Sequence, residues 1–185
     1  LKSLGSVIKF SKDKKLVKIS KSKKNKVFVP YSLVKTMRAG ILLLGPLLTR
    51  YKSAKISLPG GCAIGSRPVN LHLEALRKMG AKIKIKDGYI FASAQNGLKG
   101  CTIKFPKISV GATENILIAA CFAKGETKLR NCAVEPEIND LINFLKKLGC
   151  KIKQIGKRSI NILGVGELKS TVHSVIFDRI ETGTY

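Results

Sequence analysis

The chain has 185 residues, 44% of them hydrophobic, which is enough for one sizeable core and too little for two large domains. Its formal net charge is +24, with 35 Lys and Arg against 11 Asp and Glu, and a surface this basic favours anionic partners. Nucleic acid is one such partner. The lysines, however, are scattered and no nucleic-acid-binding motif is present, so we expect no specific nucleic-acid partner.

Cysteine usage and apolar runs restrict the class further. The odd number of cysteines, without a Cys-x-x-Cys pair, argues against a disulfide scaffold and a zinc site, and we expect neither a metal nor a cofactor. The longest apolar run, Ile41–Leu48, is interrupted and too short to cross a bilayer. We therefore expect a cytoplasmic protein with no membrane partner. Four cysteines lie in or beside apolar runs and are predicted to be buried: Cys101, Cys121, Cys132 and Cys150.

A repeated pattern organises the chain. Each copy ends a helix at a glycine that suits a left-handed C-cap. An alternating strand follows, and the hairpins are predicted to turn near Asp13, Asp87 and Lys157. The three copies are Leu1–Lys9, Leu76–Lys84 and Leu145–Lys153, with Gly5, Gly80 and Gly149 as the capping glycines.

Between the hairpins, apolar spacing predicts a helix, a strand and a second, amphipathic helix. The unit therefore reads helix, strand, helix, hairpin. At about 70 residues it suits a pseudo-symmetric α/β domain better than a solenoid. The first unit has a helix with apolar positions from Leu33 to Leu48, a strand at Lys55–Leu58 and a helix at Val69–Met79. The second has a helix with Ile116, Ile118, Ala119 and Phe122 on its apolar face, a strand at Thr127–Arg130 and a helix at Pro136–Leu148.

The loop within Leu58–His72 contains three glycines, Cys62 and Arg67. Glycine lets a backbone approach a ligand closely, and the planar guanidinium of Arg67 suits phosphate or carboxylate. Taken alone, such a loop is more often an ordinary connection between a strand and a helix. Cys62 is nevertheless the one cysteine in polar, glycine-rich surroundings.

The amino-acid sequence of this loop follows the pattern L-P-G-G-C-x-I-G-x-R-P-V-D-L-H, with Asn70 in place of the aspartate. Four further motifs occur in the same order: Tyr31–Ala39, Lys107–Thr113, Glu135–Ile138 and Asp178–Thr184. Together they resemble the UDP-N-acetylglucosamine 1-carboxyvinyltransferases, the enolpyruvyl transferases of peptidoglycan synthesis. Five motifs across nearly the whole chain are far more specific than one glycine pattern.

The resemblance implies an α/β fold of pseudo-symmetric βαβαββ units, arranged as an inside-out α/β barrel domain. Residues 1–177 would be this domain, truncated at its N-terminus and carrying the cysteine loop, and residues 178–185 would cross into a second domain of the full-length chain. Members of that family are more than twice as long. On this interpretation the chain is a fragment that is inactive alone.

The activity implied by the resemblance is transfer of the enolpyruvyl group of phosphoenolpyruvate to the 3-hydroxyl of UDP-N-acetylglucosamine, with release of phosphate. Cys62 would be the catalytic acid and the target of fosfomycin, since a thiol is mostly protonated near neutral pH yet can give up its proton. One alternative is the shikimate-pathway enolpyruvyl transferase, which lacks this cysteine loop. Another is a basic, nonenzymatic binding fragment.

The resemblance also assigns substrate-binding residues. Arg38 would lie at the anionic substrates, although a helical arginine is more often a solvated charge. A second group would bind the uridine and diphosphate. Asn70 lacks the carboxylate that the family has at this position, which places the side-chain part of that recognition in doubt. The members of this second group are Arg67, Pro68, Val69, Asn70 and Leu71.

A further anion site is predicted where a helix begins near Ala112, because helix N-termini favour phosphate. Glu135 is predicted to contact the sugar nucleotide, against the alternative of a first-turn acid that offsets the helix dipole. Asp178 and Arg179 would belong to the domain hinge, with partners outside this chain, while His72 and His173 are expected to be packed or without a role. The residues of the anion site are Lys107, Ser109, Val110 and Gly111.

Overall fold

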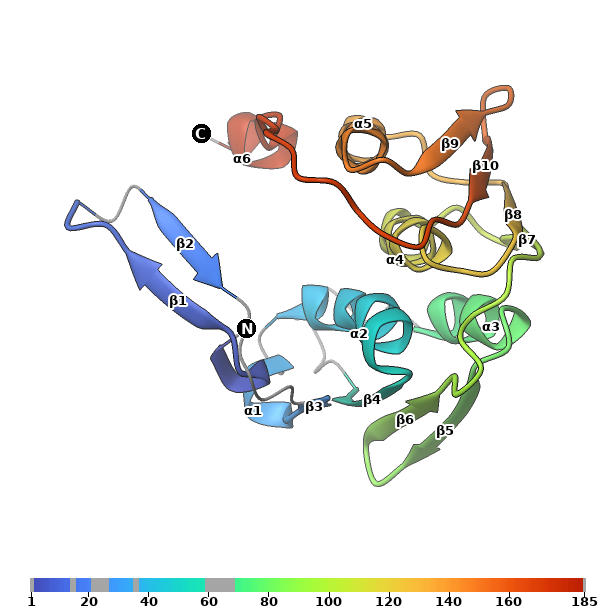
Figure 1. The fold of residues 1–185 in the computed structure, drawn as a ribbon, viewed down its shortest axis with the longest axis horizontal. Helices are drawn as coiled ribbons and strands as arrows, with labels where there is room; N and C mark the ends of the chain where they lie inside the picture. Colours follow the sequence, from blue (N-terminus) through green and yellow to red (C-terminus); the bar gives the residue numbers. More distant parts are fainter. Residues whose placement is uncertain (1, 14–15, 21–26, 35–36, 59–68, 185) are drawn as a thin grey trace.

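The structure is a computed structural model that describes residues 2–13, 16–20, 27–34, 37–58 and 69–184. Its long helices gather in the middle of the molecule and its strands lie around them (Figure 1). This arrangement, with sheets outside and helices inside, confirms the predicted α/β class.

The first unit forms a four-stranded sheet in the order β3-β4-β6-β5, in which β3 and β4 are parallel and the other pairs antiparallel. Its helices connect the strands in the order that the apolar spacing predicts. The elements are β3 (Phe28–Val29), α1 (Tyr31–Val34), η2 (Arg38–Leu43, a 3-10 helix), α2 (Leu44–Tyr51), β4 (Ser53–Ser57), α3 (Asn70–Lys78), β5 (Lys82–Lys86) and β6 (Tyr89–Ser93).

The second unit repeats this plan. Its sheet has the order β7-β8-β10-β9, again with the first pair parallel and the rest antiparallel. The predicted repeat of helix, strand, helix and hairpin is thus confirmed for both units. The elements are β7 (Thr102–Lys104), α4 (Val110–Ala120), β8 (Glu126–Arg130), α5 (Pro136–Lys147), β9 (Lys151–Gln154) and β10 (Ser159–Leu163).

A third hairpin stands apart near the N-terminus (blue in Figure 1), formed by β1 (Val7–Phe10) and β2 (Val17–Ser20) after the short 3-10 helix η1 (Lys2–Leu4). The glycine before each hairpin is left-handed, with φ of 93° at Gly5, 96° at Gly80 and 99° at Gly149. The predicted C-caps are therefore confirmed at all three positions.

Helix α4 is the centre of the core, because α2, α3 and α5 all pack against it. Its apolar residues cover nearly the whole circumference, as expected for a helix with no solvent face. Ile116 and Leu117 are completely buried, as are Leu48 of α2 and Leu76 of α3. One predicted core residue is wrong, since Phe122 lies just past the end of α4 and is 40% exposed.

The predicted single helix from Leu33 to Leu48 is also wrong, because α1, η2 and α2 divide this stretch. A Cβ on Gly40 would lie 2.4 Å from Cγ1 of Val34, so the chain folds back on itself there. Pro46 then falls in the first turn of α2, where its missing N–H costs nothing. Apolar spacing alone does not distinguish one long helix from several shorter ones that share a buried face.

The prediction that four cysteines are buried is confirmed for three of them. Cys121, Cys132 and Cys150 are buried, whereas Cys101 is half-buried.

After β10 the chain runs in extended form past α5 to a short final helix, α6 (Arg179–Thr184), shown in red in Figure 1. Within the described ranges, no helix combines the length and the apolar character that crossing a membrane requires.

Candidate functional site at the helix N-termini

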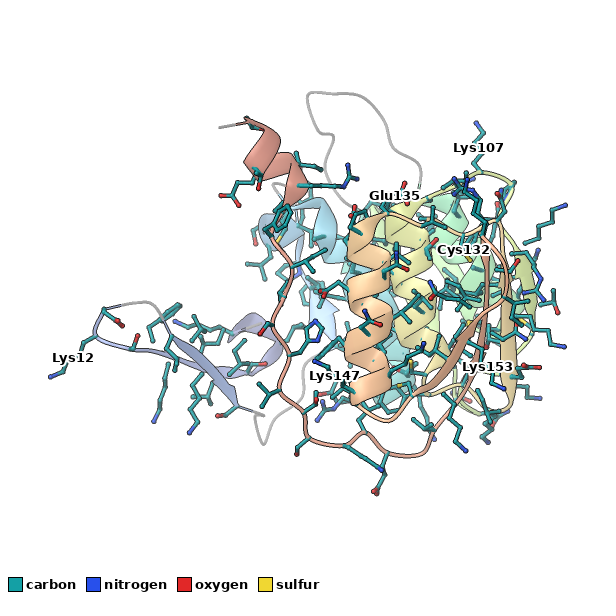
Figure 2. All side chains as sticks on the ribbon, turned by 90° about the horizontal axis from the view of Figure 1, so that it is seen from above. Lys12, Lys107, Cys132, Glu135, Lys147 and Lys153 are labelled. Atoms are coloured by element: carbon teal, nitrogen blue, oxygen red, sulfur yellow. The ribbon has the colours of Figure 1, made fainter. Side chains whose placement is uncertain are left out.

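Helices α3, α4 and α5 each begin after the carboxyl end of a strand, namely β4, β7 and β8. Figure 2 shows Lys107 and Glu135 at one end of the molecule and Lys147, which closes α5, at the other. Ligands of open α/β sheets bind at the carboxyl ends of the strands, and helix N-termini offer N–H groups to anions. This end of the molecule is therefore the candidate site.

The N-terminus of α4 is built by Ser109, whose extended backbone and side chain form the cap. Its Oγ accepts a hydrogen bond from the Ala112 N–H at 3.2 Å. The N–H groups of Val110 and Gly111 precede that capped group at the same helix end, and Lys107, three residues before Val110, is exposed. The hydroxyl of Ser109 thus shapes the helix start, while the backbone and Lys107 supply what an anion needs.

Thr113 joins this helix start to the loop before α5. Its hydroxyl donates to the Ser109 carbonyl at 2.8 Å and accepts from the Ala133 N–H at 3.1 Å, and the residue is completely buried. Two residues after Ala133, Glu135 is the N-cap residue of α5, and its carboxylate accepts from the Val134 N–H at 2.7 Å. The structure therefore gives Glu135 a local role in the loop, and its contact with a sugar nucleotide stays a prediction.

The hairpin turns support the loops that leave the two sheets. The Leu58 N–H, where the cysteine loop begins, donates to the Gly88 carbonyl at 2.8 Å. In the second unit the Cys132 N–H donates to the Arg158 carbonyl at 3.1 Å, which is the equivalent link. Each loop thus leaves its sheet beside the turn of its own hairpin.

Acidic and thiol groups near this end have shifted pKa values. Burial, followed by the neighbouring charge of Glu137, raises the pKa of Glu114. Hydrogen bonds from Arg179 lower the pKa of the Glu137 carboxyl. Burial raises the pKa of the Cys132 thiol to about 11 against the opposing pull of Arg130, so this thiol is a poor nucleophile near neutral pH.

The structure brings several predicted residues together. Val69 directly precedes α3, and Asn70 and Leu71 form its first turn, with Asn70 exposed. Helix α3 packs on α4, and a Cβ on Gly111 would lie 3.4 Å from Cε1 of His72. The segments that begin α3, α4 and α5 therefore lie side by side.

Other predicted residues fall elsewhere or outside the described part. Cys62, Arg67 and Pro68 lie outside the described residues, and Arg38 begins η2 without a described side chain. The expectation that Arg179 has no partner inside this chain is wrong. Its Nη2 and Nε lie 3.2 Å and 3.3 Å from the two carboxylate oxygens of Glu137, in the first turn of α5. Asp178 accepts from the Ile180 N–H at 2.8 Å and so caps α6.

Two side-chain pairs were not foreseen from the sequence. His72 is buried and bonded to Asn115, which confirms it as a packed histidine. His173 Nε2 lies 3.0 Å from Asp140 Oδ1 and its ring lies against Phe144, although the sequence showed no motif around it. Both pairs join residues more than 30 positions apart, so no local pattern could have found them. Across the described part of the chain, no group of three or more His, Cys, Asp or Glu side chains could hold a metal.

Comparison with known proteins gives one family. The family model described as EPSP synthase (3-phosphoshikimate 1-carboxyvinyltransferase) matches residues 1–185. A protein of Pelagibacter ubique named UDP-N-acetylglucosamine 1-carboxyvinyltransferase is 60% identical over all of this chain, which covers 44% of that protein. A protein of the same name from Endomicrobium trichonymphae is 55% identical over 94% of this chain, which covers 42% of that protein. The chain thus spans less than half the length of these relatives.

Solved structures agree on the fold. The enolpyruvyl transferase NikO from Streptomyces tendae superposes with a TM-score of 0.82 at 23% identity, over 99% of this chain and 43% of NikO. EPSP synthase from Acinetobacter baumannii gives a TM-score of 0.67 at 21% identity, over 90% of this chain and 38% of that protein. At these identities the likeness concerns the fold alone.

Proposed function

This chain belongs to the EPSP synthase family of enolpyruvyl transferases along its whole length, and from this premise we propose the activity of the complete protein. The protein transfers the enolpyruvyl group of phosphoenolpyruvate to the 3-hydroxyl of UDP-N-acetylglucosamine and releases phosphate. The observation that carries the choice of acceptor is the name shared by relatives that are 54% to 60% identical. The shikimate-type alternative has support only from the description of the family model.

The geometry supports a diphosphate at the start of α4. The N–H groups of Val110 and Gly111, the positive end of the helix dipole and the ammonium of Lys107 all favour a doubly charged anion there. Pro68 and Leu71 would cover the uracil, and Arg67 would add positive charge. Asn70, exposed in the first turn of α3, offers hydrogen bonds but no carboxylate, so its part in recognition rests on the amide and the backbone.

The proposed reaction is an addition followed by an elimination. The 3-hydroxyl oxygen bonds to C2 of phosphoenolpyruvate while C3 gains a proton, and Cys62 is the proposed donor. The C2–O bond to phosphate then breaks as C3 loses a proton, which restores the double bond and releases phosphate. The base for the hydroxyl proton is assigned to the second domain, which we propose completes the site in the full-length protein.

The proposal also sets the cellular context. Peptidoglycan precursors that carry UDP are made in the cytoplasm, so we place the complete protein there, as a target of fosfomycin through alkylation of Cys62.

The first test uses the full-length protein and two acceptors. We expect phosphate release from phosphoenolpyruvate with UDP-N-acetylglucosamine and none with shikimate 3-phosphate. Lys107→Gln should raise KM for the sugar nucleotide on the order of tenfold, because it removes a charged hydrogen-bond partner. Lys104→Gln is the matched control, since Lys104 is an exposed lysine of the neighbouring strand β7.

The outcomes separate the three interpretations. Turnover with shikimate 3-phosphate alone would establish the alternative activity. No turnover with either acceptor, by a protein that is folded, would favour a nonenzymatic binding protein. Equal KM values for the Lys107 and Lys104 variants would remove Lys107 from the anion site.

A further inference from the structure

Asn115 is a completely buried polar residue in the central helix α4, and its amide makes three hydrogen bonds to other elements. Its Oδ1 accepts from the Gly45 N–H at 2.9 Å. Its Nδ2 donates to the Ile41 carbonyl at 3.0 Å and lies 3.0 Å from Nδ1 of His72. A buried amide with both ends bonded fixes the groups around it, because leaving any of them unpaired is costly.

The first two bonds hold the junction of η2 and α2. Ile41 belongs to η2, which begins at Arg38, and Gly45 lies in the first turn of α2, where N–H groups have no partner within the helix. A Cβ on Gly45 would lie 2.5 Å from Oδ1 of Asn115 and 2.8 Å from its backbone oxygen. Helices α2 and α4 therefore approach closely here. The hydrogen bond from Asn115 to Ile41 holds η2 against α4.

The third bond holds the start of α3. Since the Asn115 amide nitrogen can only donate, Nδ1 of His72 is the acceptor, and the neutral imidazole carries its proton on Nε2. The ring lies against Gly111 at the start of α4. His72 directly follows Asn70 and Leu71, so its orientation sets where these two residues stand relative to the N–H groups of α4.

We propose that Asn115 is a positioning residue that aligns three segments of the substrate site: η2, which begins at Arg38, the start of α3 and the start of α4. The proposal rests on the function proposed above for the choice of ligand, and on the three hydrogen bonds for the alignment. Asn115 lies inside the core and acts through the backbone of η2 and the ring of His72. None of the sequence motifs identifies it as a functional residue.

A nearly isosteric apolar substitution separates positioning from packing. Asn115→Leu keeps the number and branching of the side-chain heavy atoms but leaves the Gly45 N–H, the Ile41 carbonyl and the His72 Nδ1 without this partner. We expect KM for UDP-N-acetylglucosamine to rise on the order of tenfold in the full-length protein, with kcat per active site little changed. Asn115→Asp keeps an acceptor for Gly45 and, with the other imidazole tautomer, for His72, so its KM should lie between those of wild type and Asn115→Leu.

The control is Ile162→Ala, which empties a fully buried position on β10, in the outer sheet of the second unit. It should destabilise the fold at a position outside the three segments. Active sites are counted in each sample, so that loss of folded protein does not enter kcat. A structural role alone would lower the active fraction in both variants and leave both KM values unchanged.

A second readout does not depend on catalysis. Amide hydrogen exchange of the full-length protein should show faster exchange in residues 38–45 and 70–76 of Asn115→Leu than in Ile162→Ala. Turnover by wild type together with an unchanged KM and unchanged exchange in Asn115→Leu would overturn the positioning role and leave the proposed function intact. If wild type shows no turnover but both segments exchange faster in Asn115→Leu, the alignment stands and the proposed function fails.

Discussion

Burial controls the chemistry of individual thiols in this protein. Cys121 and Cys132 are completely buried, and burial raises the pKa of both, to about 11 for Cys132. A buried thiol with a raised pKa is protonated at physiological pH and reacts slowly with electrophiles. Reactivity toward an epoxide such as fosfomycin is therefore not expected at these positions.

The raised pKa of Cys132 makes stability depend on pH in a defined direction. The unfolded thiol ionises near its ordinary pKa of 9.0 and the folded one near 11, so the folded state retains the proton longer. The resulting stability is fully present below pH 9 and is lost as the pH rises from 9 toward 11. Urea midpoints of wild type and Cys132→Ala, measured at pH 8 and at pH 10, should converge at the higher pH. The variant serves as the control for lysines, which titrate in the same range, and a constant gap between the two midpoints would contradict the assignment.

At the residue scale, the local sequence predicts where helices begin, but not which side chains distant in the sequence pair with one another. The cap formed by Ser109 follows from a serine placed before an apolar run, and the sequence suffices to predict it. The pairs Arg179 with Glu137 and His173 with Asp140 depend on where α6 and the extended segment before it pass α5. No periodicity in the sequence encodes that path.

At the scale of elements, two glycines that follow secondary-structure elements perform different tasks. Gly80 has φ of 96° and open space where a Cβ would lie, whereas a Cβ on Gly164 would lie 1.7 Å from the Ala123 carbonyl oxygen. The first glycine is needed for its backbone angle and the second for close approach of two chain segments. Both kinds of glycine look alike in the sequence.

These two roles predict different costs. Gly80→Ala should lower the free energy of unfolding by about 1 kcal/mol, because only the left-handed angle is strained. Gly164→Ala should cost at least ~3 kcal/mol, because backbone must move to admit the methyl group. Urea unfolding of the 185-residue chain measures both, and Gly166→Ala, where a Cβ meets nothing within 4 Å, is the control. Equal losses for Gly80→Ala and Gly164→Ala would contradict this distinction.

The helices and strands were predictable where a single period governs a segment. The two amphipathic helices begin and end within a residue or so of their predicted bounds, since each has one clear apolar face. The stretch from Leu33 to Leu48 was not predictable, because α1, η2 and α2 share buried positions that mimic one helix. Gly40 of η2 lies against Val34 of α1, a close approach that one continuous helix would not allow and that no period in the sequence reveals.

At the scale of the whole molecule, the net charge of +24 produces electrostatic repulsion that opposes folding. Surface lysines repel one another, and salt screens this repulsion beyond the Debye length, which is about 10 Å at 0.1 M. Folding brings these charges closer together, so their repulsion lowers the free energy of unfolding. The basic surface is thus compatible with an enzyme of anionic substrates and also makes the fold sensitive to ionic strength.

The expected consequence is a melting temperature that rises with salt. Between about 0.02 M and 0.3 M NaCl the increase should be roughly 2–4 °C, if screening recovers ~1 kcal/mol. The double variant Lys151→Glu/Lys153→Glu, on exposed positions of β9, lowers the net charge and should show a smaller increase. A fall in the melting temperature of wild type with added NaCl would mean that attractive ion pairs outweigh the repulsion.

The link between each hairpin turn and its neighbouring loop has a consequence for how such a protein diversifies. Leu58 is tied to Gly88 in one unit, and Cys132 to Arg158 in the other. Each unit therefore has its own anchor for the start of the loop that follows its strand, and the anchor lies within the same contiguous stretch of gene as the loop. A lengthened or shortened hairpin would change the anchor of one loop and leave the other in place, so a lineage can reshape one half of the proposed recognition surface without disturbing the other half.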